Sequence, residues 1–211
     1  MARPLYNLLI TVLTLLFVLR LFYKSLREPH YRRQWWRRFA LGLPARTRPG
    51  EGLIWVHAVS VGELLAVAPL IERLLTEWPD KAVLVTNTTP TGSAQAQKLF
   101  GDRVEHTWFP FDAPLVTGAF IRHWDPQLIV MVETEIWPNL LMSAKDHSVP
   151  VALVNARLSA RSARGYARLG SLTTQALNDF DLIACHPCMK SGCRRRRSGT
   201  GPASRRGAAQ T

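Results

Sequence analysis

Residues 53–75 read LIWVHAVSVGELLAVAPLIERLL, and this stretch decides the fold class. It begins with an apolar run typical of a buried strand and passes through a short polar segment at 57–63. It then continues with Leu64, Ala68, Ile71 and Leu75 at helical spacing. A buried strand that leads directly into an amphipathic helix is the repeating unit of a parallel sheet wrapped by helices. We therefore expect an α/β fold.

The same alternation continues through residues 51–184, which we expect to form one Rossmann-like domain. Apolar runs predict strands at 53–59, 82–88, 104–109, 128–132, 151–155 and 182–184. Helical spacing predicts helices at 63–76, 93–100, 113–123, 138–146 and 163–180, with Asp112 as the cap of the helix over 113–123. Neither G-x-G-x-x-G nor a P-loop pattern is present, so the sequence does not support a tightly bound dinucleotide or nucleoside triphosphate.

The net charge of +12 is concentrated at the two ends of the chain. Residues 1–50 hold ten Lys or Arg against one acid, residues 51–184 hold ten against fourteen, and residues 185–211 hold seven against none. Because the central domain is mildly acidic, we do not expect it to bind nucleic acid.

The N-terminal residues 1–24 are expected to form a membrane-anchor helix, since residues 5–19 carry no charge and Arg20 can extend its head group toward the interface. A signal peptide is the competing interpretation, but no small-residue cleavage site follows. Residues 25–50 then read as a basic interfacial segment in which Trp35 and Trp36 lie among arginines, and the alternative is a solvated linker. The positive-inside bias places the domain on the cytoplasmic face of the inner (plasma) membrane.

The C-terminal residues 185–211 differ in composition from everything before them. They contain all three cysteines of the chain, four consecutive arginines and no acid or aromatic residue. We expect a disordered basic tail produced by a frameshift or truncation. Zinc binding through Cys185, Cys188 and Cys193 is an alternative, but a second ligand pair at a known spacing is lacking. RNA binding by the arginines is another.

Polar residues cluster directly after four of the predicted strands, where ligands bind in an open parallel sheet. We therefore expect one site, formed by residues that converge at a single edge of the sheet. The candidates are Ser60, Gly62, Glu63, Thr88, Thr89, Thr91, Gly92, Ser93, Glu133, Glu135, Asn155 and Arg157.

Glu63 allows two interpretations. Ser60 and Glu63 have the spacing of a capping box, in which each side chain binds the other's backbone N–H at the start of a helix. The position at the ligand edge instead suggests a general base, although the helix dipole lowers the basicity of such a carboxylate unless burial or a like charge opposes it. Glu133 or Glu135 can supply that like charge, or both can simply be charges at the start of the next helix.

Two other groups are equally open. The threonine-rich loop at 88–93 either caps the helix that follows it or holds an anion through its N–H and hydroxyl groups. Arg157 is either an anion clamp or a surface residue.

Four motifs together resemble one family. They are HAVSVGE (57–63), TPTGS (89–93), VETEIWPN (132–139) and NARLSARS (155–162), and the resemblance to the 3-deoxy-D-manno-octulosonic acid (Kdo) transferases of lipopolysaccharide assembly extends over about 5–184. The resemblance implies the N-terminal Rossmann-like domain of a GT-B glycosyltransferase. That enzyme would transfer Kdo from CMP-Kdo to lipid IVA, a lipid A precursor, with inversion and without a metal or other cofactor.

The resemblance also implies roles for individual residues. Glu63 would be the general base that deprotonates the acceptor hydroxyl, and Glu133 would help to stabilise the transition state. The other candidates would bind the acceptor, and the basic segment at 25–50 would face the anionic membrane that carries lipid A.

This chain also departs from the family. Members are about twice as long, and their second domain binds the CMP-sugar, so we expect the present chain to be inactive alone. The alternative function is a membrane-tethered module that binds a lipid head group without catalysis, with Glu63 acting only as a cap.

Overall fold

The computed structural model describes residues 6, 8, 10–12, 16, 23, 34–48, 51–133, 135–156 and 171–185. The elements in chain order are a 3-10 helix η2 (Trp35–Phe39), β1 (Gly52–His57), α2 (Val61–Glu77), β2 (Lys81–Asn87), α3 (Pro90–Phe100), a short 3-10 turn η3 (Gly101–Arg103), β3 (Glu105–Trp108), α4 (Pro114–Trp124), β4 (Pro126–Val132), α5 (Pro138–Asp146), β5 (Val151–Ala156), α7 (Ser171–Asn178) and β6 (Leu182–Cys185).

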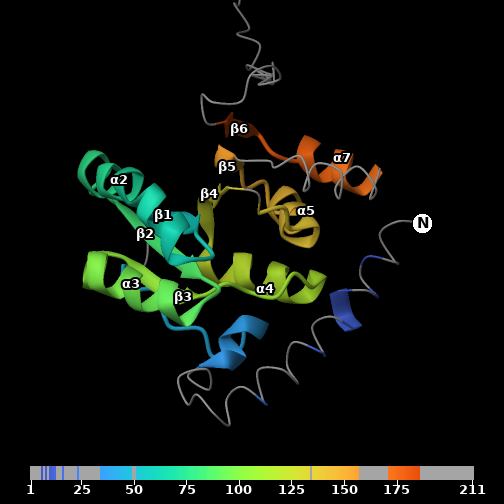
Figure 1. The fold of residues 1–211 in the computed structure, drawn as a ribbon, viewed down its shortest axis with the longest axis horizontal. Coiled ribbons are helices and arrows are strands. Elements are labelled where there is room, and N and C mark those ends of the chain that lie inside the picture. Colours follow the sequence, from blue (N-terminus) through green and yellow to red (C-terminus); the bar gives the residue numbers. More distant parts are fainter. Residues whose placement is uncertain are drawn as a thin grey trace, which may run out of the picture.

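The strands form one six-stranded parallel sheet in the order β3-β2-β1-β4-β5-β6 (Figure 1). His57 at the end of β1 pairs with Thr86 of β2 on one side and with Met131 of β4 on the other. The chain order reverses between β1 and β4, so the loops after these two strands run to opposite faces of the sheet. This reversal is the topological switch point at which doubly wound folds bind ligands.

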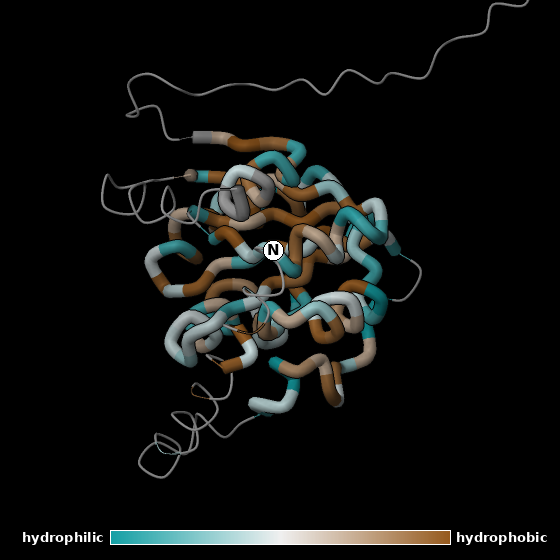
Figure 2. Tube along the Cα trace, turned by 90° about the vertical axis from the view of Figure 1, so that its right-hand side faces the viewer, coloured by the Kyte–Doolittle hydropathy of each residue, from teal (hydrophilic) through white to brown (hydrophobic). Residues whose placement is uncertain are grey.

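Two hydrophobic cores flank the sheet, one on each face. On one face α2 and α3 pack against Ile54, Val56, Val83 and Val85, and on the other α4, α5 and α7 pack against Leu53, Trp55, Leu84 and Met131. Figure 1 shows these helices on the two sides of the strands, and Figure 2 shows the apolar strand segments enclosed between them. Because both faces of β1 are buried, its sequence is apolar without alternation, as expected for a parallel sheet.

The predicted strands and the α/β class are confirmed, with boundaries that move by one or two residues. The helix predicted at 93–100 begins earlier, at Pro90, because Thr89 is its N-cap and proline is well suited to the first helical position. The helix predicted at 163–180 is described only over Ser171–Asn178, since residues 157–170 lie outside the described part of the chain.

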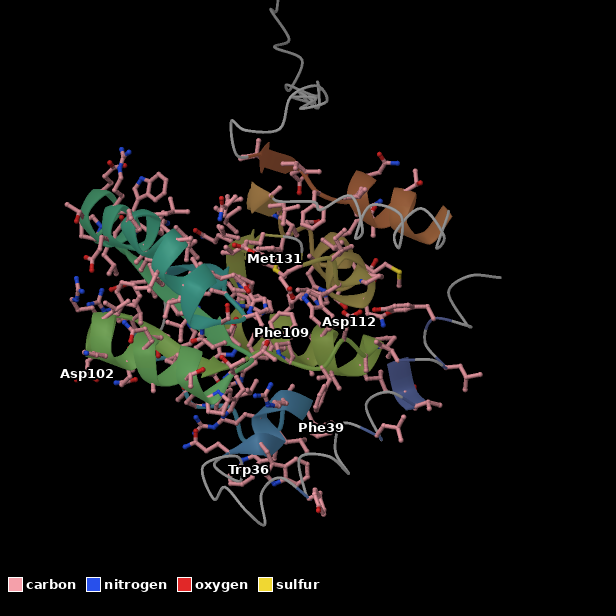
Figure 3. The ribbon with its side chains drawn as sticks, viewed as in Figure 1. Trp36, Phe39, Asp102, Phe109, Asp112 and Met131 are labelled. Carbon is pink, nitrogen blue, oxygen red and sulfur yellow. The ribbon has the colours of Figure 1, made fainter. Side chains whose placement is uncertain are left out.

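The role predicted for Asp112 is wrong. α4 begins after Ala113 without a side-chain cap, and the Asp112 carboxylate instead accepts hydrogen bonds from the backbone N–H groups of Asn139 (3.1 Å) and Leu140 (2.8 Å). These two donors belong to the first turn of α5. Asp112 therefore caps the helix that packs beside α4, and its side chain lies at that junction in Figure 3.

Most of the proposed membrane anchor falls on residues outside the described part of the chain; residues 6, 8, 10–12, 16 and 23 are the exceptions. In the portion that the structure places, no helix is both long and apolar enough to cross a membrane. The predicted tail at 185–211 also lies outside it, apart from the backbone of Cys185 in β6.

The basic segment is partly built into the domain. Arg38 of η2 is buried, donates a hydrogen bond of 2.6 Å to the carbonyl of Thr88, and stacks 4.5 Å from the ring centroid of Trp108. Arg38 was expected among cations at a membrane interface, but its guanidinium is held against the loop after β2. Trp35 and Trp36 are 39% and 43% exposed.

Candidate functional site

Glu63 lies in the first turn of α2, directly beyond the carboxyl end of β1. Its carboxylate accepts hydrogen bonds from the backbone N–H of Val59 (2.8 Å) and from the hydroxyl of Ser60 (3.1 Å). Both donors precede the helix, so the side chain is folded back over the loop that joins β1 to α2. Glu63 is half-buried there.

The capping box predicted for Ser60 and Glu63 is not formed in its reciprocal form. Ser60 is the N-cap residue, but its side chain makes no capping hydrogen bond, and its hydroxyl binds the Glu63 carboxylate instead. Gly62 beside them is exposed, and a Cβ built on it meets only the Ser60 hydroxyl at 4.0 Å. The helix start therefore leaves open space next to the Glu63 carboxylate.

The loop after β4 brings two more carboxyl groups to this edge of the sheet. Glu133 directly follows the strand with a left-handed backbone (φ 62°), a conformation that costs a non-glycine residue about 1–3 kcal/mol and that often occurs at functional sites. Glu135 is half-buried and accepts a hydrogen bond of 2.8 Å from the indole N–H of Trp137. Since β1 and β4 are adjacent, the three acids gather at the switch point.

The three carboxyl groups are close enough for their charges to affect one another's pKa. Burial raises the pKa of Glu63, with a contribution from the charge of Glu133, although the hydrogen bonds from Val59 and Ser60 oppose the shift. Burial, followed by the charge of Glu63, raises the pKa of Glu135 to about 7. A carboxylate with a raised pKa is a better proton acceptor, so this arrangement is suited to acid–base chemistry.

The threonine-rich loop after β2 is tied to the loop that carries Glu63. The carbonyl of Val59 accepts hydrogen bonds from the N–H groups of Thr88 (3.3 Å) and Thr89 (3.2 Å) and from the Thr89 hydroxyl (3.2 Å). Thr89 also caps α3 by accepting from the N–H of Gly92 (3.1 Å). Of the two interpretations left open by the sequence, capping is confirmed for Thr89.

The space around Gly92 shows why this position carries a glycine. A Cβ there would lie 3.0 Å from the Thr89 hydroxyl and 3.3 Å from the carbonyl of Val59. Thr91 is exposed, and Ser93 lines a cavity of about 370 Å³ with Gln34, His106, Thr107 and Trp108. The loop thus fits closely against the first strand-to-helix turn and carries an exposed hydroxyl and a small cavity on its outer side.

The remaining candidates lie after β5. Asn155 has a left-handed backbone (φ 53°), and its side-chain amide nitrogen is buried with no hydrogen-bond partner among the residues that the structure describes. The N–H of Glu133 donates to the carbonyl of Val154, which places Asn155 beside the Glu133 turn. Arg157 lies outside the described residues, so its predicted role as a clamp stays a prediction.

Two aromatic residues near the acids were not identified from the sequence. His57 is fully buried and stacks on Phe109 with ring centroids 3.7 Å apart, and Phe109 in turn contacts Trp137 at 5.3 Å. Burial lowers the pKa of His57 to about 3, so its imidazole is neutral at physiological pH. Figure 3 places Phe109 near the centre of the molecule. This stack lies beneath the loop that carries Glu135, and no short-range sequence signal marks it.

The acids do not form a metal site of a recognisable kind. Among the residues that the structure places, no group of three or more His, Cys, Asp or Glu side chains is arranged to hold a metal ion.

Comparison with known proteins identifies the family. The family model for 3-deoxy-D-manno-octulosonic-acid transferase (kdotransferase) matches residues 33–191. A 3-deoxy-D-manno-octulosonic acid transferase of Haemophilus influenzae is 37% identical over 160 residues, covering 76% of this chain and 37% of the relative. The transferase of the same name from Bordetella pertussis is 41% identical over 135 residues, covering 62% of this chain and 31% of the relative.

Among solved structures, a putative UDP-N-acetylglucosamine 2-epimerase from Listeria monocytogenes aligns with a TM-score of 0.45 and 12% identity, covering 64% of this chain and 39% of that one. The present chain spans less than two-fifths of the length of the two transferases named above. The family model covers well over half of the chain and includes each strand and helix that forms the acid cluster. The chain therefore belongs to the 3-deoxy-D-manno-octulosonic-acid transferase (kdotransferase) family.

Proposed function

We propose that this chain forms the acceptor-side half of a GT-B glycosyltransferase that transfers Kdo from CMP-Kdo to lipid IVA with inversion. The observation that carries the proposal is the position of Glu63: half-buried at the switch point, with a raised pKa, and close enough to Glu133 and Glu135 to interact with their charges. Family membership supports the transfer of Kdo, whereas the donor and acceptor named here are part of the proposal.

In this mechanism Glu63 acts as the general base. Its carboxylate removes the proton of the acceptor hydroxyl as the oxygen attacks the anomeric carbon of the donor sugar. The bond from that carbon to the phosphate oxygen breaks at the same time, and CMP leaves with its electron pair. The hydrogen bonds from Val59 and Ser60 hold the carboxylate in one orientation, and the open space beside Gly62 leaves room for the acceptor. Glu133 stabilises the positive charge that develops on the sugar ring in the transition state.

The other candidates contribute to acceptor binding in this proposal. The residues Ser60, Thr88, Thr89, Thr91, Gly92 and Ser93 border the same edge as Glu63, and Glu135 and Asn155 follow the strands on the far side of the switch point. Arg157, two residues after Asn155 in the sequence, is included on the resemblance alone. The CMP-Kdo site is proposed to lie in residues that the relatives have and this chain does not match. We therefore expect the purified chain, mixed with CMP-Kdo and lipid IVA, to give no product.

We further propose that the domain works on the cytoplasmic face of the inner membrane, where lipid IVA is presented. The exposed rings of Trp35 and Trp36, next to the arginines of the 25–50 segment, suit contact with anionic head groups.

One alternative has specific support. Because Glu63 accepts hydrogen bonds from the loop that starts α2, it can serve purely as a structural cap. The domain would then be a membrane-tethered module that binds a lipid head group without catalysis.

The variant Glu63→Gln separates the two functions. The assay uses this chain joined to the part of the Haemophilus influenzae relative that its match leaves uncovered, with CMP-Kdo and lipid IVA as substrates. A general base predicts a loss of kcat of roughly 100-fold or more with little change in unfolding free energy. The matched control is Glu77→Gln at the exposed C-terminal end of the same helix, which should leave kcat unchanged. If Glu63→Gln lowers stability but keeps the rate, the catalytic proposal is wrong.

A further inference from the structure

Arg38 stands at the beginning of a series of hydrogen bonds that ends at Glu63. Arg38 is 6% exposed, and its guanidinium donates a hydrogen bond of 2.6 Å to the carbonyl of Thr88 while it lies 4.5 Å from the ring centroid of Trp108. Burial of a guanidinium is costly unless the charge has well-placed partners. The fold therefore holds this side chain in one place, against the loop after β2.

The backbone around Arg38 is fixed independently of its side chain. The carbonyl of Arg38 accepts the N–H of Phe111 at 2.8 Å, and the ring of Phe39 packs against the ring of Phe111 with centroids 4.8 Å apart. η2 also lies beside β3. Arg38 thus reaches the loop after β2 from a firm support, so that a change in its side chain should alter the loop without displacing η2.

The loop that Arg38 holds is bonded in turn to the residue that holds Glu63. The peptide unit between Thr88 and Thr89 accepts from Arg38 through its carbonyl and donates through the N–H of Thr89 to the carbonyl of Val59 at 3.2 Å. The N–H of Val59 then donates to the Glu63 carboxylate at 2.8 Å. Three consecutive hydrogen bonds therefore connect the buried guanidinium to the carboxylate, and hydrogen bonds in such a series strengthen one another.

We propose that Arg38 is a positioning residue for the reaction, which sets the place of the Glu63 carboxylate through the Thr88–Thr89 peptide unit and Val59. This inference rests on the proposed function, in which Glu63 is the general base. A base must lie within hydrogen-bond reach of the proton that it removes, and a misplacement of about 1 Å can lower the rate by roughly 100-fold. The position of the loop is therefore a direct determinant of the rate.

A purely structural arginine would make the same contacts but would behave differently when it is replaced. Its loss would lower the stability of the whole domain, so that amides of the loop and amides of the core would lose protection together. A positioning residue instead loosens the loop locally and slows the step in which the base acts. The experiments below separate these two effects.

The first test is amide hydrogen exchange of this chain, followed by NMR. Arg38→Met keeps the apolar stem and removes the donor. The N–H groups of Thr88, Thr89 and Val59 should then exchange roughly tenfold faster relative to that of Val85 in the buried part of β2, because a hydrogen bond from a charged group is lost. Arg38→Lys should restore part of the protection, since its ammonium can donate to the same carbonyl without the planar geometry of a guanidinium.

Arg103→Met is the matched control. Arg103 likewise lies near an aromatic ring, that of Phe100 at 5.9 Å, and donates to a backbone carbonyl, that of Leu99 at 3.0 Å. It belongs to η3, which precedes β3 and so lies toward the edge of the sheet where the strands begin, away from Glu63. Its replacement should leave both the exchange of the three loop amides and the rate of turnover unchanged.

The second test measures turnover in the fused enzyme that serves for Glu63→Gln. Arg38→Met should lower kcat roughly tenfold and change the KM for the acceptor by less than about twofold. In the background of Glu63→Gln it should cause no further loss of kcat, because a residue that acts only through Glu63 then has no base to position. Arg38→Lys should recover part of the rate.

Four results would overturn the inference. They are wild-type protection of the loop amides in Arg38→Met, an equal loss of protection in the core, a further loss of kcat when Arg38→Met is added to Glu63→Gln, and a raised KM with unchanged kcat. If Arg38→Met does not fold, Arg38→Lys decides the question, because faster exchange confined to the loop together with a lower kcat supports the inference and wild-type values for both overturn it.

These results differ from failure of the proposed function. Retained turnover in Glu63→Gln would refute the catalytic proposal, and with it the role of Arg38 in the reaction, whatever the exchange experiment shows. A fused enzyme that requires Glu63 but turns over normally with Arg38→Met would refute only the role of Arg38.

Discussion

Replacing Asp112 by alanine should destabilise the whole domain, although Asp112 lies outside the acid cluster. Asp112 is 3% exposed, and its carboxylate accepts hydrogen bonds from the N–H groups of Asn139 and Leu140 and from the hydroxyl of Tyr6 at 2.5 Å. In addition, the Asn139 side chain donates to the carbonyl of Asp112 at 2.6 Å. The residue thus joins the start of α4 to the start of α5, the helix that follows Trp137.

The magnitude follows from the donors that alanine leaves unpaired. A buried N–H without a partner costs about 1–3 kcal/mol, and two of them in the first turn of α5 give an expected loss of about 3 kcal/mol in unfolding free energy. Asp112→Asn keeps one acceptor oxygen, so its expected loss is about 1–2 kcal/mol. Urea unfolding followed by tryptophan fluorescence measures both, since Trp55 and Trp124 are fully buried.

The control is Asp102→Asn, an exposed aspartate in the 3-10 turn η3 that follows α3 (Figure 3), which should change stability by less than about 0.5 kcal/mol. A loss below about 1 kcal/mol for Asp112→Ala would refute the assignment of this carboxylate as the cap of α5. So would equal losses for the alanine and asparagine variants, because the reasoning depends on the retained acceptor oxygen.

Two further predictions concern the loops and the pH dependence of stability. Gly92→Ala should lower the unfolding free energy by about 1–2 kcal/mol, because the new Cβ would crowd the Thr89 hydroxyl and the carbonyl of Val59. Gly62→Ala has open space around the new Cβ, so it should raise the unfolding free energy by up to about 1 kcal/mol through helix propensity while impairing acceptor binding. Urea unfolding of the two variants measures both changes, and equal effects would contradict the packing argument. Burial lowers the pKa of His106 to about 4, with a contribution from Arg37, so the neutral imidazole contributes stability above its unfolded pKa of 6.5 that is lost as pH falls toward 4. Between pH 6.5 and pH 4, the unfolding free energy of His106→Gln should therefore fall less steeply with pH than that of the wild type, by up to about 1.4 kcal/mol per pH unit. Urea unfolding at several pH values measures both slopes, and identical slopes for variant and wild type would contradict the prediction.

Much of the fold could be predicted from local patterns. The apolar runs and helical spacings fixed the strands and helices, because each of these elements buries a face that its own sequence displays. The site could also be located, since residues that follow parallel strands must meet at one edge of the sheet. Glu63, Glu133 and Glu135 were found in this way.

The sequence by itself determined the parallel α/β class and the loops that carry polar residues. Only the tertiary structure decided what those residues contact. Asp112 caps a helix 27 residues further along the chain, and Arg38 binds a carbonyl 50 residues away. The raised pKa of Glu135 depends on burial and on the charge of Glu63, which comes from another loop. Periodicity reports which side of an element is buried, whereas hydrogen-bond partners and pKa values depend on which distant groups the fold brings into contact.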